Sequence, residues 1–344
     1  MTTNKMNSIL IIYTGGTIGM VKDEKTGTLK TFNFSSLLDE IPEIKKFKST
    51  IETISFENPI DSSNMQPENW LQIAQIIFDN YQKHDGFVIL HGSDTMAYTA
   101  SALSFLLENL SKPVILTGSQ LPIGAMRTDA KENLLSAIEI ASLKENNKAV
   151  VPEVAIYFEY NLYRGNRSTK VSAEEFAAFK SPNYSLLAEA GVNLKFNKSI
   201  ISKANNKPLI FHKTLNNHIA TIKLFPGITE EQIFSTIQIP GLKAIVMETF
   251  GAGNASTQIW FIDLLIEAIK KGIIILNISQ CDGGSVEQGK YETSFAFNKI
   301  GVIGGKDMTY EAAVTKLMYL LGTTLSTTEI KKLLPQSLRG ELTE

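Results

Sequence analysis

Three short polar turns of this 344-residue chain carry side chains that could perform nucleophilic chemistry. They are "TGGT" at 14–17, "HGSDT" at 91–95 and "GNRSTK" at 165–170. A threonine or serine hydroxyl becomes a nucleophile when a neighbouring group accepts its proton. A lysine near a carboxylate in a cleft can be that base if burial keeps part of it neutral. The turns therefore contain suitable residue types, although each turn also has an ordinary structural interpretation.

The glycine pair at 15–16 could form a phosphate-binding loop or a plain turn. The segment lacks the lysine of the G-x-x-x-x-G-K-[ST] motif, and its glycines do not match G-x-G-x-x-G. Gly–Gly turns are common, so a structural turn is the stronger interpretation of the pair by itself. Thr17 is nevertheless a candidate nucleophile, because the polar stretch "MVKDEKTGTLK" (20–30) follows it and could fold over a site as a lid.

Ser93 and Asp94 lie where a predicted helix begins. Serine and aspartate are expected N-cap residues, so helix capping alone would explain both side chains. The same helix N-terminus also offers free N–H groups to a carboxylate ligand. His91 suggests a Ser-His-Asp triad, but Ser93 is not in a G-x-S-x-G motif and His91 lies only two residues before it. Because position decides acid–base chemistry first, we do not favour a catalytic role for His91.

Apolar runs directly precede "TGGT", "HGSDT" and the further turn "TGSQ". These runs predict buried strands, and the periodic apolar segments between them predict helices. The expected strands are 9–16, 86–92, 112–120 and 153–158, and the expected helices are 68–82, 94–110 and 132–143. Such alternation is typical of an α/β fold with a mostly parallel sheet. Ligands of open α/β sheets bind beyond the carboxyl ends of the strands, so the turns after the strands mark the expected site.

The length of the chain predicts two domains. A stretch rich in Asn, Ser and Lys separates two series of strand–helix alternation. We expect a larger N-terminal α/β domain with the catalytic residues at 1–185, a linker at 186–208 and a smaller C-terminal α/β domain at 209–344. The predicted fold class is α/β, with a larger mixed sheet that has helices on both faces and a smaller parallel sheet.

The composition argues against several functional classes. Lys and Arg total 33 and Asp and Glu total 35, which gives a net charge of −2, so we expect no nucleic acid as the main partner. No apolar stretch approaches about 18 residues, and we expect neither a membrane span nor a signal peptide. The single cysteine, Cys281, allows no internal disulfide and fits a reducing cytoplasm. No group of His, Cys, Asp and Glu has metal-ligand spacing, so we expect no metal and no cofactor.

Five motifs in series resemble those of the bacterial asparaginase/glutaminase family, and most closely its cytoplasmic (type I) L-asparaginases. They are "TGGTIG", "DSSNM" (61–65), "HGSDTMAYTASAL", "GNRSTK" and "GAGN" (251–254), and they span nearly the whole chain in the family's order. The resemblance implies hydrolysis of L-asparagine to L-aspartate and ammonia through a threonine nucleophile and an acyl-enzyme. It also implies a cytoplasmic enzyme without a cofactor.

The resemblance assigns roles to the matching residues. Thr17 corresponds to the nucleophile, and Ser93, Asp94 and Lys170 correspond to a catalytic relay in which Lys170 is the base. The implied substrate-binding residues are Asp61, Ser62, Ser63, Ser93, Asp94 and Asn254. In related enzymes an asparagine from a neighbouring subunit reaches the site, and Asn254 would fill that role here. A homodimer or homotetramer is therefore expected.

Two positions depart from the family pattern. Ser93 stands where the family has threonine, which keeps the hydroxyl but removes the methyl group that restricts χ1. Thr28 stands where the family has a lid tyrosine. These departures leave open an amino-acid-binding sensor, or a weakly active amidohydrolase that acts on glutamine or another amide. An amidase subunit of a tRNA-dependent amidotransferase is a further alternative, and it would require an extra N-terminal barrel.

Overall fold

The computed structural model describes residues 6–22, 29–31, 41–289 and 292–344. The chain divides into two compact units. The first unit comprises residues 1–181 and 185–212, and the second comprises residues 182–184 and 213–344. Each unit contains a central sheet of its own, and the predicted two-domain α/β class is confirmed.

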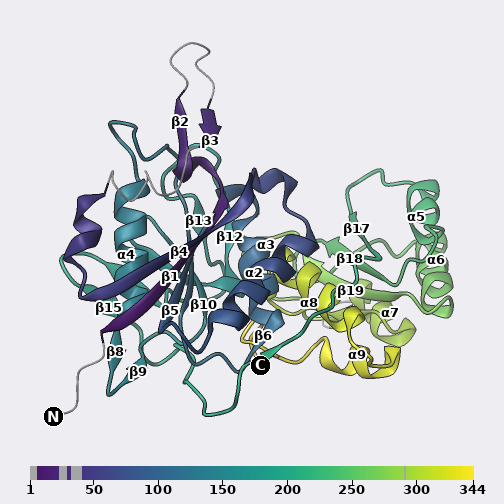
Figure 1. The fold of residues 1–344 in the computed structure, drawn as a ribbon. Helices are drawn as coiled ribbons and strands as arrows, with labels where there is room; N and C mark the ends of the chain where they lie inside the picture. Colours follow the sequence, from purple (N-terminus) through teal and green to yellow (C-terminus); the bar gives the residue numbers. More distant parts are fainter. Residues whose placement is uncertain (1–5, 23–28, 32–40, 290–291) are drawn as a thin grey trace. The chain divides into compact units, whose positions relative to one another are not determined.

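An eight-stranded mixed sheet forms the centre of the first unit (Figure 1), in the order β15-β14-β11-β10-β7-β5-β1-β4. The strands are β1 (Asn7–Gly15), β4 (Ser49–Ile60), β5 (Gly86–Leu90), β7 (Val114–Thr117), β10 (Val154–Phe158), β11 (Asn161–Arg164), β14 (Ala188–Ala190) and β15 (Leu194–Phe196). The strands from β4 to β10 in this order pair in parallel, and β11, β14 and β15 add antiparallel pairs. The central parallel strands are continuous apolar runs because both of their faces are buried.

Helices cover both faces of this sheet. They are α2 (Pro67–Asn80), α3 (Met96–Leu106) and α4 (Ala130–Ser142). α2 packs on α3, whereas α4 contacts β1, β5, β7 and β10 and lies on the other side of the sheet in Figure 1. The helix predicted at 68–82 is confirmed, since Gln66 and Asn69 form a capping box and Pro67 occupies the first turn.

The prediction of a helix over 94–110 is wrong at its C-terminal end. α3 stops at Leu106, and Leu107–Glu108 form the short strand β6, which pairs with β16 (Ile210–Phe211). The apolar pattern cannot reveal this exchange, because the pairing partner is about a hundred residues away in the sequence. The stretch 186–208, predicted to be a linker, contributes β14 and β15 to the large sheet and lies within the first unit.

Short elements lead from the sheet into the polar turns. The 3-10 helices are η1 (Thr17–Gly19), η2 (Pro42–Lys46), η3 (Ser62–Asn64), η4 (Ser93–Thr95) and η5 (Gly165–Arg167). The two-stranded pairs are β2 (Met20–Lys22) with β3 (Leu29–Thr31), β8 (Lys144–Glu145) with β9 (Lys148–Ala149), and β12 (Thr169–Lys170) with β13 (Phe179–Lys180). Four of the 3-10 helices, η1, η3, η4 and η5, follow the ends of strands at the polar turns.

The second unit is built on a four-stranded parallel sheet in the order β17-β18-β19-β20. The strands are β17 (Ile219–Lys223), β18 (Ala244–Thr249), β19 (Ile274–Ser279) and β20 (Ile303–Gly304). The helices are α5 (Glu230–Ile237), α6 (Ile259–Lys270), α7 (Glu292–Ile300), α8 (Tyr310–Gly322) and α9 (Thr327–Leu333). Phe261 of α6 and Phe297 of α7 are fully buried in one apolar cluster with strand residues such as Met247, so the sheet and helices share a core.

A buried ion pair connects α8 with the C-terminal segment of the second unit. The Lys316 ammonium lies 2.5 Å from a Glu341 carboxylate oxygen, and both side chains are completely buried. Lys316 also donates to the carbonyl oxygens of Leu334 and Gln336, and Glu341 accepts from the Arg339 N–H. Burial lowers the pKa of Lys316, and the Glu341 charge opposes that shift. The pair therefore binds residues 334–341 to the core of the unit.

Candidate active site

The polar turns meet where the order of the large sheet reverses. β1 pairs in parallel with β4 on one side and with β5 on the other, so the chain leaves β1 and β5 at neighbouring carboxyl ends. This is the position at which open α/β sheets bind ligands. Gly16 follows β1 with φ 89°, and a Cβ placed on it would lie 2.5 Å from the Gly92 nitrogen. Glycine thus lets the turns after β1 and β5 touch through their backbones.

The turn after β4 joins the same place. A Cβ on Gly92 would lie 2.5 Å from Ser62 Oγ, and Thr95 Oγ1 donates to the Ser62 carbonyl oxygen at 2.7 Å. Asp61 caps η3, because its Oδ1 accepts hydrogen bonds from the Ser63 N–H and the Ser63 hydroxyl, both at 3.0 Å. Ser62 is buried, whereas Ser63 bonds to the Asp61 carboxylate. The structure therefore brings the predicted substrate turn against the turn that carries Ser93.

Lys170 connects the third motif to the second. Its Nζ donates to Ser93 Oγ at 2.8 Å and to Asp94 Oδ1 at 2.6 Å, although these residues lie 77 and 76 positions away. The lysine side chain is 16% exposed and the Asp94 side chain is 62% exposed. The hydrogen-bonded group is thus mostly enclosed at the lysine and open to solvent at the aspartate. Ser93, Asp94 and Lys170 form the group that the sequence predicts.

Helix capping does not explain Ser93 and Asp94. The N-cap of α3 is Thr95, which makes no side-chain cap hydrogen bond. Ser93 Oγ instead donates to Gln120 Oε1 at 3.3 Å while it accepts from Lys170. Because both side chains bond to other partners, helix capping does not explain why serine and aspartate stand here.

Gln120 is a residue of the site that the sequence analysis did not single out. Besides accepting from Ser93, it donates through Nε2 to the Glu175 carbonyl oxygen at 2.9 Å. Its backbone N–H donates to both carboxylate oxygens of the buried Asp129, at 3.1 and 2.9 Å. The signal available in the sequence is the turn "TGSQ" directly after a buried strand, which marks the expected site but indicates no role for Gln120.

The two threonines of the first turn differ in their surroundings. Thr14 is completely buried, and its hydroxyl donates to the Leu90 carbonyl oxygen at 2.9 Å. It therefore joins β1 to the end of β5. Thr17 is half-buried at the start of η1, one residue after the glycine that touches Gly92. The Thr14 hydroxyl is therefore used inside the sheet, whereas Thr17 directly follows the contact between Gly16 and Gly92.

His91 has a structural environment. It is fully buried; its Nδ1 lies 2.7 Å from the Gly92 carbonyl oxygen, and its Nε2 lies 2.8 Å from Thr99 Oγ1. Burial lowers its pKa from 6.5 to about 4, so the ring is neutral at pH 7. A carbonyl oxygen can only accept, so Nδ1 carries the proton and donates to Gly92. Nε2 is then the acceptor for the Thr99 hydroxyl, whose oxygen accepts from Trp70 Nε1 at 2.9 Å. Both ring nitrogens are occupied and neither serves Ser93.

Asn254 belongs to the second unit. It closes a turn after β18, where its N–H donates to the Phe250 carbonyl oxygen at 2.8 Å and Phe250 N–H donates to its carbonyl oxygen at 2.9 Å. Its predicted contact with substrate remains a prediction. Thr28, at the position of the family's lid tyrosine, lies outside the described residues.

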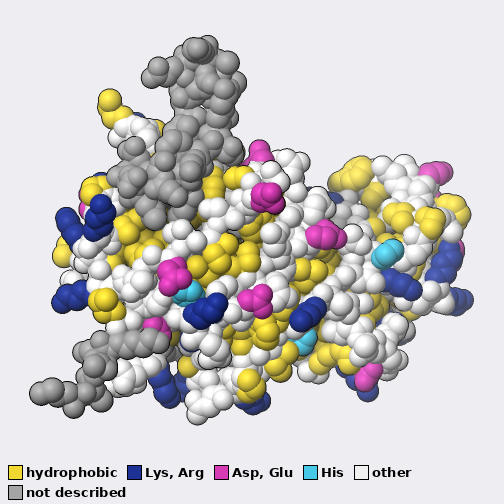
Figure 2. Space-filling model, in the orientation of Figure 1, with side chains coloured by type: hydrophobic (Ala, Val, Ile, Leu, Met, Phe, Trp, Pro, Cys, Tyr) yellow, Lys and Arg dark blue, Asp and Glu magenta, His cyan; other side chains and the backbone are white. Residues whose placement is uncertain are grey.

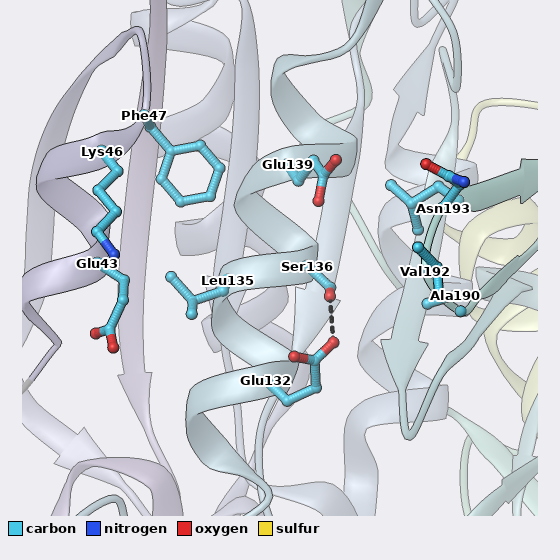
Figure 3. A pocket seen from close by; sticks show the side chains of 12 residues that line it. Glu43, Lys46, Phe47, Glu132, Leu135, Ser136, Glu139, Ala190, Val192 and Asn193 are labelled. Atoms are coloured by element: carbon cyan, nitrogen blue, oxygen red, sulfur yellow. Dashed lines mark hydrogen bonds between the residues drawn. The ribbon is translucent and has the colours of Figure 1, made fainter.

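A separate pocket of about 460 Å³ lies within the first unit (Figure 3). Its walls come from η2, α4 and the β14–β15 turn and carry Glu43, Glu132 and Glu139. The Ser136 hydroxyl in this pocket donates to Glu132 at 2.8 Å. None of the predicted site residues lines this pocket. The Ser136 hydroxyl thus donates to a carboxylate, whereas the Ser93 hydroxyl accepts a hydrogen bond from a lysine.

Three further features concern the described residues as a whole: surface charge, metal-binding groups and membrane-spanning helices. On the face drawn in Figure 2, Lys and Arg side chains are interspersed with Asp and Glu over the described residues. Among those residues no group of three or more His, Cys, Asp and Glu could hold a metal ion. No helix in the described part of the chain has both the length and the apolar composition to cross a membrane.

Comparisons with known proteins cover almost the whole chain. The family model described as "Asparaginase, N-terminal" matches residues 8–202, and "Glutaminase/Asparaginase C-terminal domain" matches residues 218–334. The sequence is 44% identical over 337 residues to L-asparaginase 1 of Escherichia coli (strain K12), covering 98% of both chains. The crystal structure of L-asparaginase I from Vibrio cholerae O1 biovar eltor str. N16961 superimposes with a TM-score of 0.89 at 40% identity, covering 98% of this chain and 100% of that one. The thermostable L-asparaginase from Thermococcus kodakarensis gives a TM-score of 0.89 at 32% identity, covering 98% and 99%.

Proposed function

The chain belongs to the asparaginase family, and from that premise we propose how its site hydrolyses L-asparagine to L-aspartate and ammonia. The observation that carries the proposal is the pair of hydrogen bonds from Lys170 Nζ to Ser93 Oγ and Asp94 Oδ1. A lysine that is hydrogen-bonded to a hydroxyl and a carboxylate, next to the turn that carries a candidate nucleophile, is suited to transfer protons to and from that nucleophile.

Thr17 is the nucleophile in this mechanism. Its Oγ1 attacks the side-chain amide carbon of L-asparagine and gives up its proton, and a tetrahedral oxyanion forms. The C–N bond then breaks, ammonia leaves with a transferred proton, and an ester joins Thr17 to the aspartyl group. Water attacks this ester, Thr17 regains its proton, and L-aspartate is released. Backbone N–H groups in the touching turns supply donors for the oxyanion.

Ser93, Asp94 and Lys170 move the protons. Lys170 acts as the base that accepts the proton which Ser93 passes on, and it returns that proton when ammonia or Thr17 leaves the tetrahedral intermediate. Asp94 holds the lysine through Oδ1 at 2.6 Å. The Ser93 hydroxyl makes this contact without the family's γ-methyl group, so the replacement of threonine by serine keeps the relay.

The charged groups of the substrate indicate which other residues of the site bind it. L-asparagine carries an α-ammonium and an α-carboxylate, which need an anion and hydrogen-bond donors respectively. Asp61 and the exposed part of the Asp94 carboxylate are the anions of the site. Ser62 supplies a hydroxyl donor, and Ser63 holds the Asp61 carboxylate in place through its N–H and hydroxyl. Asn254 of a neighbouring subunit completes the site, so the active form is a homodimer or homotetramer. The protein works in the cytoplasm, in agreement with its single cysteine.

Release of ammonia from L-asparagine by the purified protein tests this function. Turnover that disappears in Thr17→Ala supports an enzyme with a threonine nucleophile. Binding of L-asparagine or L-aspartate without turnover would instead support the amino-acid sensor. A kcat/KM for L-glutamine above that for L-asparagine would reassign the substrate, since one methylene is worth only about 1–3 kcal/mol of discrimination.

A further inference from the structure

Asn277 is a fully buried amide side chain in β19, an interior strand of the second unit's parallel sheet. Leu276 and Ile278 on either side of it are apolar and buried. Burial of an amide costs free energy unless its donor and its acceptor both find partners. Packing alone would favour an apolar residue here, so the polar side chain requires an explanation in its contacts.

Both ends of the Asn277 side chain have partners. Its Oδ1 accepts a hydrogen bond from Thr249 Oγ1 at 2.6 Å, and its Nδ2 donates to the Gly253 carbonyl oxygen at 3.3 Å. Thr249 is also completely buried and is the last residue of β18. The shorter of the two hydrogen bonds that its hydroxyl can make goes to Asn277 rather than to the Ile278 carbonyl oxygen, which lies at 3.3 Å. The two side chains therefore form a small buried network beneath a turn.

This network contacts the peptide group that precedes Asn254. Gly253 has φ +101°, and a Cβ on it would lie 3.2 Å from Asn277 Nδ2 and 2.8 Å from Val286 Cγ1. The Gly253–Asn254 peptide is held at both ends, because Asn277 binds its carbonyl and the Phe250 carbonyl accepts from its N–H at 2.8 Å. The orientation of a peptide plane determines where the next Cα–Cβ bond points.

The other carbonyl groups of this turn also accept hydrogen bonds. Ser279 Oγ donates to the Gly251 carbonyl oxygen at 2.7 Å, and Glu287 N–H donates to that of Ala252 at 3.0 Å. The bond from Asn277 is buried, whereas the bond from Ser279, the last residue of the same strand, is exposed. A rigid element thus fixes the residue whose side chain is expected to reach substrate.

We propose that Asn277, supported by Thr249, is a positioning residue for substrate binding. It fixes the Gly253–Asn254 peptide and so directs the Asn254 side chain toward L-asparagine. The proposal rests on the role proposed above for Asn254. Asn277 itself does not touch the substrate, and its effect passes through Asn254 alone.

Steady-state kinetics with Asn277→Leu, Asn254→Ala and the double variant of the full-length protein test this role. Leucine has the same number and branching of side-chain heavy atoms as asparagine and removes both polar ends. We expect Asn277→Leu to raise KM for L-asparagine about tenfold or more with a smaller change in kcat, because misplacing a binding group by about 1 Å can cost about 100-fold. The double variant should have the KM of Asn254→Ala, since the two changes act on one contact.

Thr249 supplies a gentler variant if Asn277→Leu does not fold. Thr249→Val removes the hydroxyl that supports Asn277 and keeps the shape, so KM should rise, whereas Thr249→Ser should restore it. Thr315→Val is the matched control. It removes another fully buried threonine hydroxyl of the same unit, one that donates within α8 to the Glu311 carbonyl oxygen at 2.8 Å. The control should leave KM at its native value.

The outcomes separate the positioning role from its premise. A native KM in both Asn277→Leu and Thr249→Val, beside a raised KM in Asn254→Ala, overturns the positioning role and leaves the proposed function intact. An equal rise in KM in the native and Asn254→Ala backgrounds also overturns it, since the effect would not pass through Asn254. A native KM in Asn254→Ala itself would remove the premise and the positioning role together.

Discussion

Replacement of Lys170 by methionine separates catalysis from stability. Methionine keeps the apolar stem and deletes the ammonium that binds Ser93 and Asp94. The Asp94 side chain is 62% exposed, so water already solvates the partner charge. Exposed ion pairs contribute about 0–1 kcal/mol, and we expect the free energy of unfolding to change by no more than about 1 kcal/mol.

The effect on turnover should be much larger. A positioned general base contributes about 10²–10⁴-fold to rate, which corresponds to about 3–5 kcal/mol of transition-state stabilisation. We therefore expect Lys170→Met to lower kcat for L-asparagine by about that factor. Continuous measurement of ammonia release gives kcat, and urea denaturation of the same preparation gives the free energy of unfolding.

Lys180 provides a matched control for this experiment. It lies in β13, opposite Thr169 in the same two-stranded pair that contains Lys170, and its side chain is exposed. Lys180→Met should leave both kcat and stability unchanged. A kcat for Lys170→Met within about threefold of native would remove this lysine from the mechanism. A fall in kcat matched by a loss of several kcal/mol in stability would show that the contacts are structural.

The other expected outcomes concern the turns beneath this relay. Thr17→Ala should lower kcat at least about 1,000-fold with native folding, measured by ammonia release and circular dichroism; residual turnover near the native rate would exclude the nucleophile. Gly16→Ala places a methyl group 2.5 Å from the Gly92 nitrogen at a φ of 89°, so the Tm should fall with a loss of about 1–3 kcal/mol. Ser93→Thr restores a β-branched hydroxyl and should retain at least native kcat; a large loss would show that the pocket has adapted to serine. The pKa of His91 is lowered from 6.5 to about 4, so the unfolded chain binds more protons between these pH values. Stability should therefore decrease by about 3 kcal/mol as the pH falls from 6.5 to 4, and His91→Gln should flatten this part of a denaturation series.

The sequence predicted the parts of the fold that depend on local patterns. Strands β1, β5 and β10 are buried on both faces and are therefore continuous apolar runs. Helices α2 and α4 are buried on one face, so their apolar residues recur at helical spacing. The polar turns after the strands indicated the site for a similar reason. The sequence contains glycine at 16 and 92, but only the structure shows that the two backbones are in contact and leave no room for a side chain.

The features that could not be predicted depend on distant partners. β6 replaces the last turn of a predicted helix because β16 pairs with it, and β14 and β15 form by extending an existing sheet. Likewise, Gln120 and Asn277 look like ordinary turn and strand residues in the sequence. Their hydrogen bonds to Ser93 and Gly253 become apparent only in the folded structure. Short range propensity does not contain this information.

The buried pair of Lys316 and Glu341 sets an order of events during synthesis. The residues of the first unit, through 212, are made long before Glu341, so that unit can fold while the second is still incomplete. Until Glu341 emerges, Lys316 has no carboxylate to balance its charge, and removal of one partner of such a pair costs about 3–5 kcal/mol. We expect the second unit to close late and as one step. The relay residues would then exist on the nascent chain before the turn that presents Asn254 is fixed, and activity would begin only after translation has passed the buried glutamate.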